Sequence, residues 1–114
     1  YDDIYKEQRS KFINKKANAK RDGVEFLLDF GDIDWPEVCP VLGIPIDYLS
    51  EGRSENSCSF DRHDSNKGYV KGNLWIISRL ANVIKLDASM DELKTFSINI
   101  IKINDVMSEV KPLF

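Results

Sequence analysis

The segment from residue 59 to residue 85 reads SFDRHDSNKGYVKGNLWIISRLANVIK, and it decides the fold. Residues 57–62 and 73–78 have the composition of two short strands, and the ten residues between them contain two glycines. Residues 78–87 then place apolar side chains at helical spacing. The order of strand, glycine-containing loop, strand and helix predicts a hairpin crossed by a helix.

Polar residues stand at the two places that this arrangement brings together. Asp61 and His63 come at the end of the first predicted strand, and Asn82 and Lys85 lie in the predicted helix. A helix that crosses the hairpin points Asn82 back at Asp61. Carboxylate and amide oxygens are hard ligands that suit Mg²⁺ or Mn²⁺, which keep several waters and take further ligands from phosphate. We therefore expect a divalent-metal site between Asp61 and Asn82.

These residues resemble the ββα-metal (His-Me finger) motif of HNH nucleases and of the recombination endonuclease VII family. The matching elements are Asp61-Arg62, Gly72-Asn73, and Asn82 followed one turn later by Lys85. The sequence is most similar to a phage-type subgroup with the patterns DR-x-D-S-x-K-G-Y-x-x-G-N and A-N-x-x-K. The resemblance covers residues 12 to about 94.

A second element of the resemblance lies upstream. CPVLGIPI at residues 39–46 is similar to a zinc-knuckle turn that has lost its metal, because Leu42 stands where a second cysteine would be. No zinc is expected, since no further Cys or His stands near with zinc-ligand spacing. We interpret Cys39 and Cys58 as buried thiols of a reduced cytosolic protein.

The resemblance implies an α+β fold and a single HNH-like domain over residues 1–114. It implies a ββα-metal core over about 57–87. The sequence pattern predicts an N-terminal basic helix over 3–22 and a C-terminal helix over about 90–108. Asp61 and Asn82 would be the metal ligands, and Asn73 would tie the loop to the hairpin. Residues that would meet phosphates are Lys71, Arg79 and Lys85.

One position departs from the family. The residue after the metal-binding aspartate should be a general-base histidine, and here it is Arg62. Arginine stays protonated and cannot act as a base at neutral pH. His63 could take the role, because side chains alternate along a strand and His63 then shares a face with Asp61. Alternatively, Arg62 binds the scissile phosphate, or activity is lost; a surface histidine at a hairpin end remains equally open.

Charge is unevenly distributed along a chain whose net charge is −3. Residues 1–23 and 61–85 each carry +3, whereas residues 24–60 carry −7. A basic run is usually a solvated helix face, and a helix that contacts the DNA backbone is the alternative. In the N-terminal helix the candidate DNA contacts are Lys15, Lys16, Lys20 and Arg21.

The remaining segments have simpler interpretations. Residues 24–30 alternate as a strand does, and the proline-rich residues 31–48 predict an ordered loop that buries Trp35, Val41, Leu42 and Ile44. SMDE at residues 89–92 is a capping box. After it, five apolar residues predict a core-facing helical stripe: Leu93, Phe96, Ile100, Ile101 and Met107. In the helix over 78–87, the residues expected to face one way are Leu80, Val83 and Ile84.

The sequence thus favours a metal-dependent endonuclease that hydrolyses phosphodiester bonds in DNA, of phage or mobile-element type. The alternative is a catalytically silent protein of the same fold that binds nucleic acid or a host protein. A small structural protein without metal is a weaker third hypothesis. No apolar run approaches the roughly 20 residues of a membrane span. We expect a cytoplasmic protein, of a host cell if phage-encoded.

Overall fold

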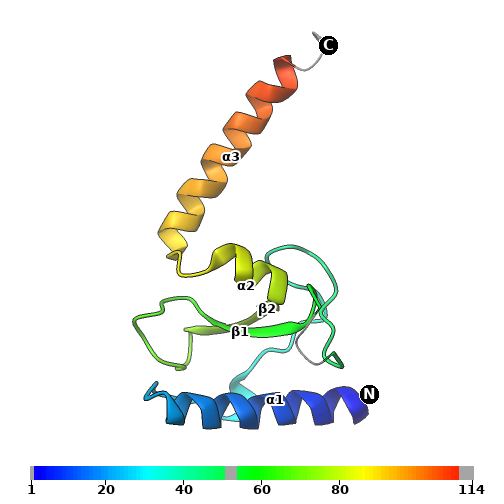
Figure 1. The fold of residues 1–114 in the computed structure, drawn as a ribbon, viewed down its shortest axis with the longest axis vertical. Coiled ribbons are helices and arrows are strands. Elements are labelled where there is room, and N and C mark those ends of the chain that lie inside the picture. Colours follow the sequence, from blue (N-terminus) through cyan, green and yellow to red (C-terminus); the bar gives the residue numbers. More distant parts are fainter. Residues whose placement is uncertain (1, 51–53, 111–114) are drawn as a thin grey trace.

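The computed structural model describes residues 2–50 and 54–110, and these form a small α+β domain. The elements in chain order are α1 (Asp2–Arg21), the 3-10 helix η1 (Phe30–Asp32), β1 (Cys58–Arg62), β2 (Leu74–Ser78), α2 (Arg79–Lys85) and α3 (Met90–Val110). Figure 1 shows the hairpin of β1 and β2 between α1 and α2, with α3 extending away from this body. The segments predicted as basic helix, ββα core and C-terminal helix therefore form these elements, with ends shifted by a few residues.

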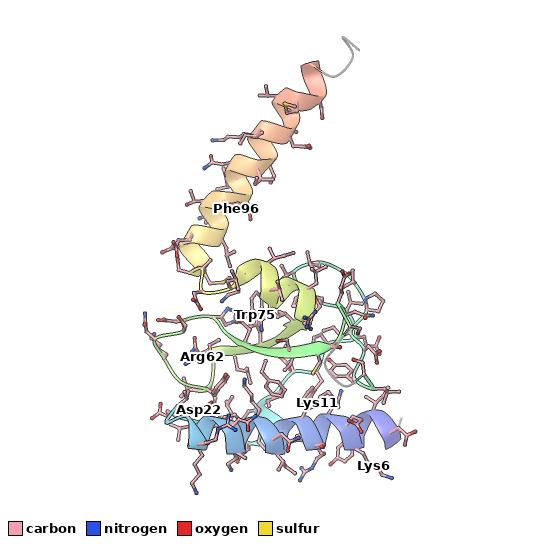
Figure 2. All side chains as sticks on the ribbon, in the orientation of Figure 1. Lys6, Lys11, Asp22, Arg62, Trp75 and Phe96 are labelled. Carbon is pink, nitrogen blue, oxygen red and sulfur yellow. The ribbon has the colours of Figure 1, made fainter. Side chains whose placement is uncertain are left out.

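The hairpin has two different faces because its side chains alternate. β1 and β2 pair antiparallel, with Phe60 opposite Ile76 and Asp61 opposite Trp75. Phe60 packs edge-on against the Trp35 ring, at 5.6 Å between ring centroids. Trp75 lies on the other face, between the hairpin and α2 (Figure 2). α2 begins at Ser78, whose hydroxyl accepts the Ala81 N–H at 3.2 Å and caps the helix.

Two hydrophobic clusters hold the body together. The larger one lies between the hairpin, α2 and the loop before β1, and its buried members are Cys39, Ile46, Tyr48, Ile76, Ile77 and Ala81. The smaller one joins α1 to the loop after β1 through Ala19, Leu28 and Tyr69. α1 therefore covers the hairpin side opposite α2, as Figure 1 shows.

The knuckle-like turn at residues 39–46 is held by hydrogen bonds. The Cys39 N–H donates to the Ile44 carbonyl at 2.8 Å, and Gly43, at φ 72°, donates to the Cys39 carbonyl at 2.9 Å. The Cys39 sulfur accepts both the backbone N–H and the hydroxyl of Ser78 at 3.3 Å. Burial raises the pKa of Cys39, but these and neighbouring backbone donors outweigh it and lower the pKa. The turn is thereby fixed to the start of α2.

Two expectations drawn from the sequence were wrong. Residues 24–30 form no strand; Phe26 makes only an isolated bridge to Tyr69. Val41 and Leu42 are exposed on the outside of their turn.

α2 forms the predicted helix and buries Ala81 and Lys85. Its other apolar residues, Leu80, Val83 and Ile84, are half-buried or exposed.

α3 was also expected to face the core, and this was wrong. Its capping box is present, since Ser89 and Glu92 exchange two hydrogen bonds of 3.0 Å. However, Phe96, Ile100, Ile101 and Met107 are exposed, because the helix points away from the body instead of folding back on it (Figure 1). The radius of gyration is 17.0 Å, against about 13 Å for a compact domain of this length. None of the described helices is long and apolar enough to span a membrane.

Gly68 offers a test of how the loop after β1 packs on the segment after α1. A Cβ atom at Gly68 would lie 2.6 Å from the Glu25 carbonyl oxygen and 2.7 Å from its Cβ, whereas a Cβ at Gly31 would meet nothing within 4 Å. We expect Gly68→Ala to lower the free energy of unfolding by about 1–3 kcal/mol, and Gly31→Ala to change it by less than about 0.5 kcal/mol. Urea unfolding measures both; equal effects would contradict the packing described.

Candidate functional site

An open cavity of about 360 Å³ lies between the end of β1, the loop that follows it, and α2. Its lining brings together two predicted metal ligands and three cations from separate elements: Asp61 and Asn82, with Arg62, Arg79 and Lys85. β1 supplies Asp61 and Arg62, and α2 supplies the other three. The hairpin and the crossing helix therefore gather these five residues around one hollow of the surface.

Asp61 is 8% exposed and its carboxylate is held on both oxygens. Oδ2 accepts the indole N–H of Trp75 at 2.6 Å and lies 3.2 Å from the Lys85 ammonium, which is also 3.4 Å from Oδ1. The indole reaches Asp61 because the two residues are direct cross-strand partners on one face of the hairpin. The carboxylate orientation is thus fixed by the fold.

Lys85 is the last residue of α2 and is only 6% exposed. Its ammonium also donates to the Arg62 carbonyl at 3.3 Å, so that it is bound to the end of β1 twice. A buried charge is tolerated only when it is paired and hydrogen-bonded. The ammonium therefore neutralises Asp61, in a position that a bound cation could share or take over.

Asn82 contacts β1 through its amide nitrogen, which donates to the Ser59 hydroxyl at 2.6 Å. The side-chain oxygen of Asn82 accepts no hydrogen bond from the described residues, whereas its backbone carbonyl accepts the Leu86 N–H at 2.9 Å. An amide oxygen and one carboxylate beside an open cavity fit a divalent ion that keeps most of its waters. The described residues hold no group of three or more His, Cys, Asp or Glu that could bind an ion, so a dedicated all-protein cage is absent from this part of the chain.

Arg62 points away from Asp61, as alternation along β1 requires. Figure 2 shows it on the hairpin side that faces α1. Its guanidinium donates to the Lys67 carbonyl at 3.0 Å and lies 5.2 Å from the centre of the Tyr69 ring. The Lys15 ammonium of α1 lies 5.2 Å from the same ring. Cations from α1 and β1 therefore meet at Tyr69, at the edge of the cavity.

His63 follows β1 and shares a side of the hairpin with Asp61 and Trp75. Its ring packs against the Trp75 indole, at 4.4 Å between centroids and tilted by 34°, and its backbone N–H donates to the Asn73 carbonyl at 2.9 Å. It is half-buried and is not among the residues that line the cavity. Asp61 and His63 thus contact the same tryptophan, one by a hydrogen bond and the other by ring packing.

Asn73 is buried directly before β2 and makes three hydrogen bonds to the loop after β1. Its side-chain oxygen accepts the Asp64 N–H at 2.9 Å, and its nitrogen donates to the carbonyls of Asp64 at 3.1 Å and Gly68 at 2.8 Å. These bonds satisfy backbone groups that would otherwise lack partners in a tight loop. They fix the loop against the hairpin and so define one wall of the cavity.

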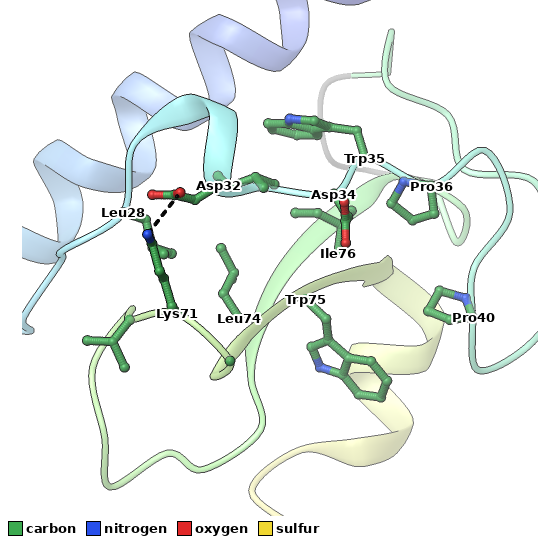
Figure 3. Close-up of a pocket in the computed structure, with 13 residues that line it drawn as sticks. Leu28, Asp32, Asp34, Trp35, Pro36, Pro40, Lys71, Leu74, Trp75 and Ile76 are labelled. Atoms are coloured by element: carbon green, nitrogen blue, oxygen red, sulfur yellow. Dashed lines mark ion pairs between the residues drawn. The ribbon is translucent and has the colours of Figure 1, made fainter.

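The other predicted phosphate contacts lie elsewhere. Lys71 pairs with Asp32 at 3.6 Å and lines a different and larger cavity, of about 730 Å³, between Trp35 and Trp75 (Figure 3). That cavity also contains Asp34, so its acids outnumber its one cation and it is poorly suited to phosphate. On α1, Lys16 and Lys20 are exposed, and Arg21 pairs with Asp22 at 3.0 Å.

Three contributors to the site were not singled out from the sequence: Trp75, Ser59 and Tyr69. The bond between Trp75 and Asp61 depends on the cross-strand register. Ser59 stands two residues before Asp61, so alternation places it beneath α2 as well. Once the hairpin register is known, both contacts follow from it.

Comparisons with known proteins give one relative. The chain is 36% identical over 81 residues to an uncharacterised 29.0 kDa protein from the dda-modA intergenic region of Enterobacteria phage T4. The match covers 68% of this chain and 32% of the phage protein, so the matched region is about a third of that relative's length. No protein-family model matches the chain. No solved structure matches it either.

Lys85 tests the buried ion pair. Lys85→Met keeps the length of the side chain but leaves Asp61 buried without its counter-charge, and we expect it to lower the free energy of unfolding by about 3–5 kcal/mol. In the double variant Asp61→Asn with Lys85→Met no charge is left unpaired, so most of the loss should be recovered. Urea unfolding of the wild type, both single variants and the double variant gives the coupling energy. Additive effects would show that the pair does not act as a unit.

Proposed function

We propose that this chain is a divalent-metal-dependent endonuclease of the HNH, ββα-metal type that hydrolyses DNA phosphodiester bonds. The observation that supports it best is the shared cavity: Asp61 and Asn82 line it from a hairpin and from the helix that crosses it, together with three cations. The resemblance of residues 57–87 to the ββα-metal motif predicts this combination of scaffold and side chains. The phage T4 relative is consistent with the phage-type subgroup.

In this proposal Asp61 and Asn82 hold the ion, with water and substrate phosphate as its other ligands. A bound Mg²⁺ or Mn²⁺ supplies charge stabilisation at the phosphate and at the leaving oxygen. Trp75 keeps the Asp61 carboxylate in one orientation through its indole N–H. The Lys85 ammonium, which neutralises Asp61 in the free protein, pairs with a substrate phosphate when the carboxylate binds the ion.

We assign the proton acceptor to His63. The chain contains one histidine, and Arg62 is excluded as a base because its guanidinium stays protonated. Asp61 and His63 lie on the same hairpin face and both contact Trp75. Packing on the indole orients the imidazole without a hydrogen bond to either of its nitrogens, so the unprotonated nitrogen of the neutral ring remains free to accept a proton.

The cations bind the DNA backbone in this proposal. Arg79 is exposed at the start of α2, and Arg62 and Lys15 meet at Tyr69 on the far edge of the cavity. Contacts of this kind position the protein on phosphates without reading sequence. They also offset the chain's net charge of −3 at the one surface where DNA would approach.

A catalytically silent DNA-binding protein is the second candidate function. It is favoured by the Lys85–Asp61 ion pair, because an ammonium already satisfies the carboxylate, and by Arg62 in the family's base position. This alternative retains the backbone contacts but needs no metal. Its affinity for DNA should fall steeply with salt as counterions are released.

Plasmid nicking with Mg²⁺ or Mn²⁺ tests the proposed activity. Asn82→Ala should lower the cleavage rate at least about 100-fold, because it removes a metal ligand. Ser59→Ala is the matched control: it removes the same Ser59–Asn82 hydrogen bond but leaves the amide oxygen in place, so it should cost less than about 10-fold. Asp61→Asn should abolish cleavage, and circular dichroism checks that each variant is folded.

The same assay separates the two candidate functions. One outcome is that the wild-type protein cuts plasmid no faster than Asp61→Asn and still binds duplex DNA with a steep salt dependence. That result would contradict the endonuclease proposal and support the silent DNA-binding protein. If binding is absent or insensitive to salt, neither DNA function holds. If Asn82→Ala and Ser59→Ala lower the cleavage rate equally, the Asn82 amide acts through its hydrogen bond to Ser59 and not as a metal ligand.

His63→Phe tests the base while keeping an aromatic ring against Trp75. We expect normal stability and a loss of cleavage of about 10²–10⁴-fold, the usual contribution of a general base. Imidazole added to the reaction should restore part of the activity to a His63→Gly variant. A His63→Phe protein that cuts at the wild-type rate would assign the residue to packing on Trp75 alone.

A further inference from the structure

α3 is a helix of 21 residues that extends from the body and exposes many large apolar side chains. Figure 2 shows Phe96 on it, well away from the hairpin and from α2. Apolar side chains on both sides of a solvated helix are costly, since each leaves hydrocarbon in contact with water. α3 therefore presents an apolar surface that would be stabilised by contact with a partner, because the contact would remove it from water.

The spacing of these side chains specifies the shape of that surface. Leu93, Phe96, Ile100, Ile103 and Met107 follow one another at intervals of three, four, three and four residues. This is the a and d pattern of a heptad repeat, which keeps a seam on one side of a helix that winds around a second helix. A flat or globular surface would not require the 3.5-residue period. The expected occupant is therefore another helix.

The charges on α3 are compatible with a second copy of the same helix. Four of the five positions that flank the seam within α3 carry no charge: Ser97, Asn99, Asn104 and Val106. The fifth, Glu92, lies in the first turn, where it is hydrogen-bonded to Ser89. Lys94, Lys102 and Asp105 occupy positions away from the seam. Charged flanking positions select unlike partners and repel identical ones. A neutral flank removes that barrier, so two identical helices can pair.

The exposed area is sufficient for a dimer. Phe96, Ile100, Ile103, Val106 and Met107 are each 48–63% exposed, and Leu93 is half-buried. Side chains of this size expose on the order of 150–200 Å² when free. Covering about half of six such side chains on each of two helices removes on the order of 1,000 Å² from water, which reaches the lower range of specific interfaces.

The seam also continues into an apolar groove at the base of α3. Leu93 and Met90 line a cavity of about 330 Å³ together with Trp75, Ile84 and Leu42. Leu42 is exposed on the knuckle-like turn, and Ile84 is exposed on α2. The side chains that were expected to lie in the core therefore gather beside the seam, where they extend its apolar surface onto the body.

We propose that this chain forms a homodimer through α3, with Leu93, Phe96, Ile100, Ile103 and Met107 as the seam of a two-helix coiled coil. The inference is independent of the proposed nuclease activity, because none of the five seam residues contacts Asp61 or lines its cavity. α3 joins the body by its first residues alone, so substitutions along its outer turns change pairing without disturbing the hairpin or α2.

Sedimentation equilibrium of the full chain tests the dimer, with protein from about 1 to about 200 µM so that mass action moves the equilibrium. We expect the mass to approach twice the 13.1 kDa of one chain. Ile103→Asp places a charge in the seam and should raise the dissociation constant at least about 30-fold. Ile101→Asp is the matched control, the same change at nearly equal exposure (61% against 59%) but outside the seam, and should leave the constant within about threefold.

Two results would overturn the proposal. A wild-type chain that stays monomeric over the whole range shows that α3 does not pair with its own copy, and cosedimentation with lipid vesicles would then identify a membrane surface as the occupant. Equal weakening by Ile103→Asp and Ile101→Asp shows association without the seam. Far-ultraviolet circular dichroism at the lowest concentration confirms that the variants keep their fold.

Discussion

The contact between the Asp61 carboxylate and the Lys85 ammonium is the constraint on which the site depends. It joins the end of β1 to the end of α2 across 24 residues of sequence, and both partners are almost completely buried. Neither charge can remain in that environment alone, so the hairpin and the helix must keep their mutual orientation. Trp75 adds a third attachment to the same carboxylate and is itself covered by the His63 ring. One buried pair thereby organises both sides of the cavity.

Around this pair the site combines rigid and adaptable parts. Asn73 and the Ser59–Asn82 bond are internal, and they fix the positions of the loop and the helix. Arg79, Arg62 and Lys15 lie at the rim, where their long side chains can move to meet a polyanion. In the proposed endonuclease, this combination of fixed central side chains and mobile cations at the edge would suit a substrate whose backbone repeats but whose sequence varies.

The sequence predicts the ββα region well because its signals there are local. Two short strands around a glycine-containing loop, followed by a capped helix, need no distant partner to be recognised, and the observed elements begin and end within a few residues of those expected. The cavity that unites Asp61 and Asn82 follows from the same order of elements. Asn73 was expected to tie the loop to the hairpin, and its side chain makes three hydrogen bonds to the loop, although the particular backbone groups it meets depend on the loop conformation.

Hydrophobic periodicity gives wrong predictions where the environment of a segment depends on the surface that it packs against. Residues 24–30 alternate like a strand but meet only a loop, and α3 has an apolar stripe but no part of the described chain to cover it. A stripe shows that a face avoids water and does not show what it packs against. Likewise, Lys85 was expected to meet phosphates, and its burial beside Asp61 could not be read from the sequence.

The turn at Cys39 has a practical consequence for the protein's biochemistry. Its sulfur accepts hydrogen bonds from the Ser78 hydroxyl and backbone N–H, and its backbone is hydrogen-bonded to Ile44 and Gly43, so hydrogen bonds close the turn. A chelator such as EDTA should therefore leave the thermal unfolding of the domain unchanged. Chelation can then test the proposed metal dependence without unfolding the protein, in contrast to a domain whose folding requires a bound zinc ion.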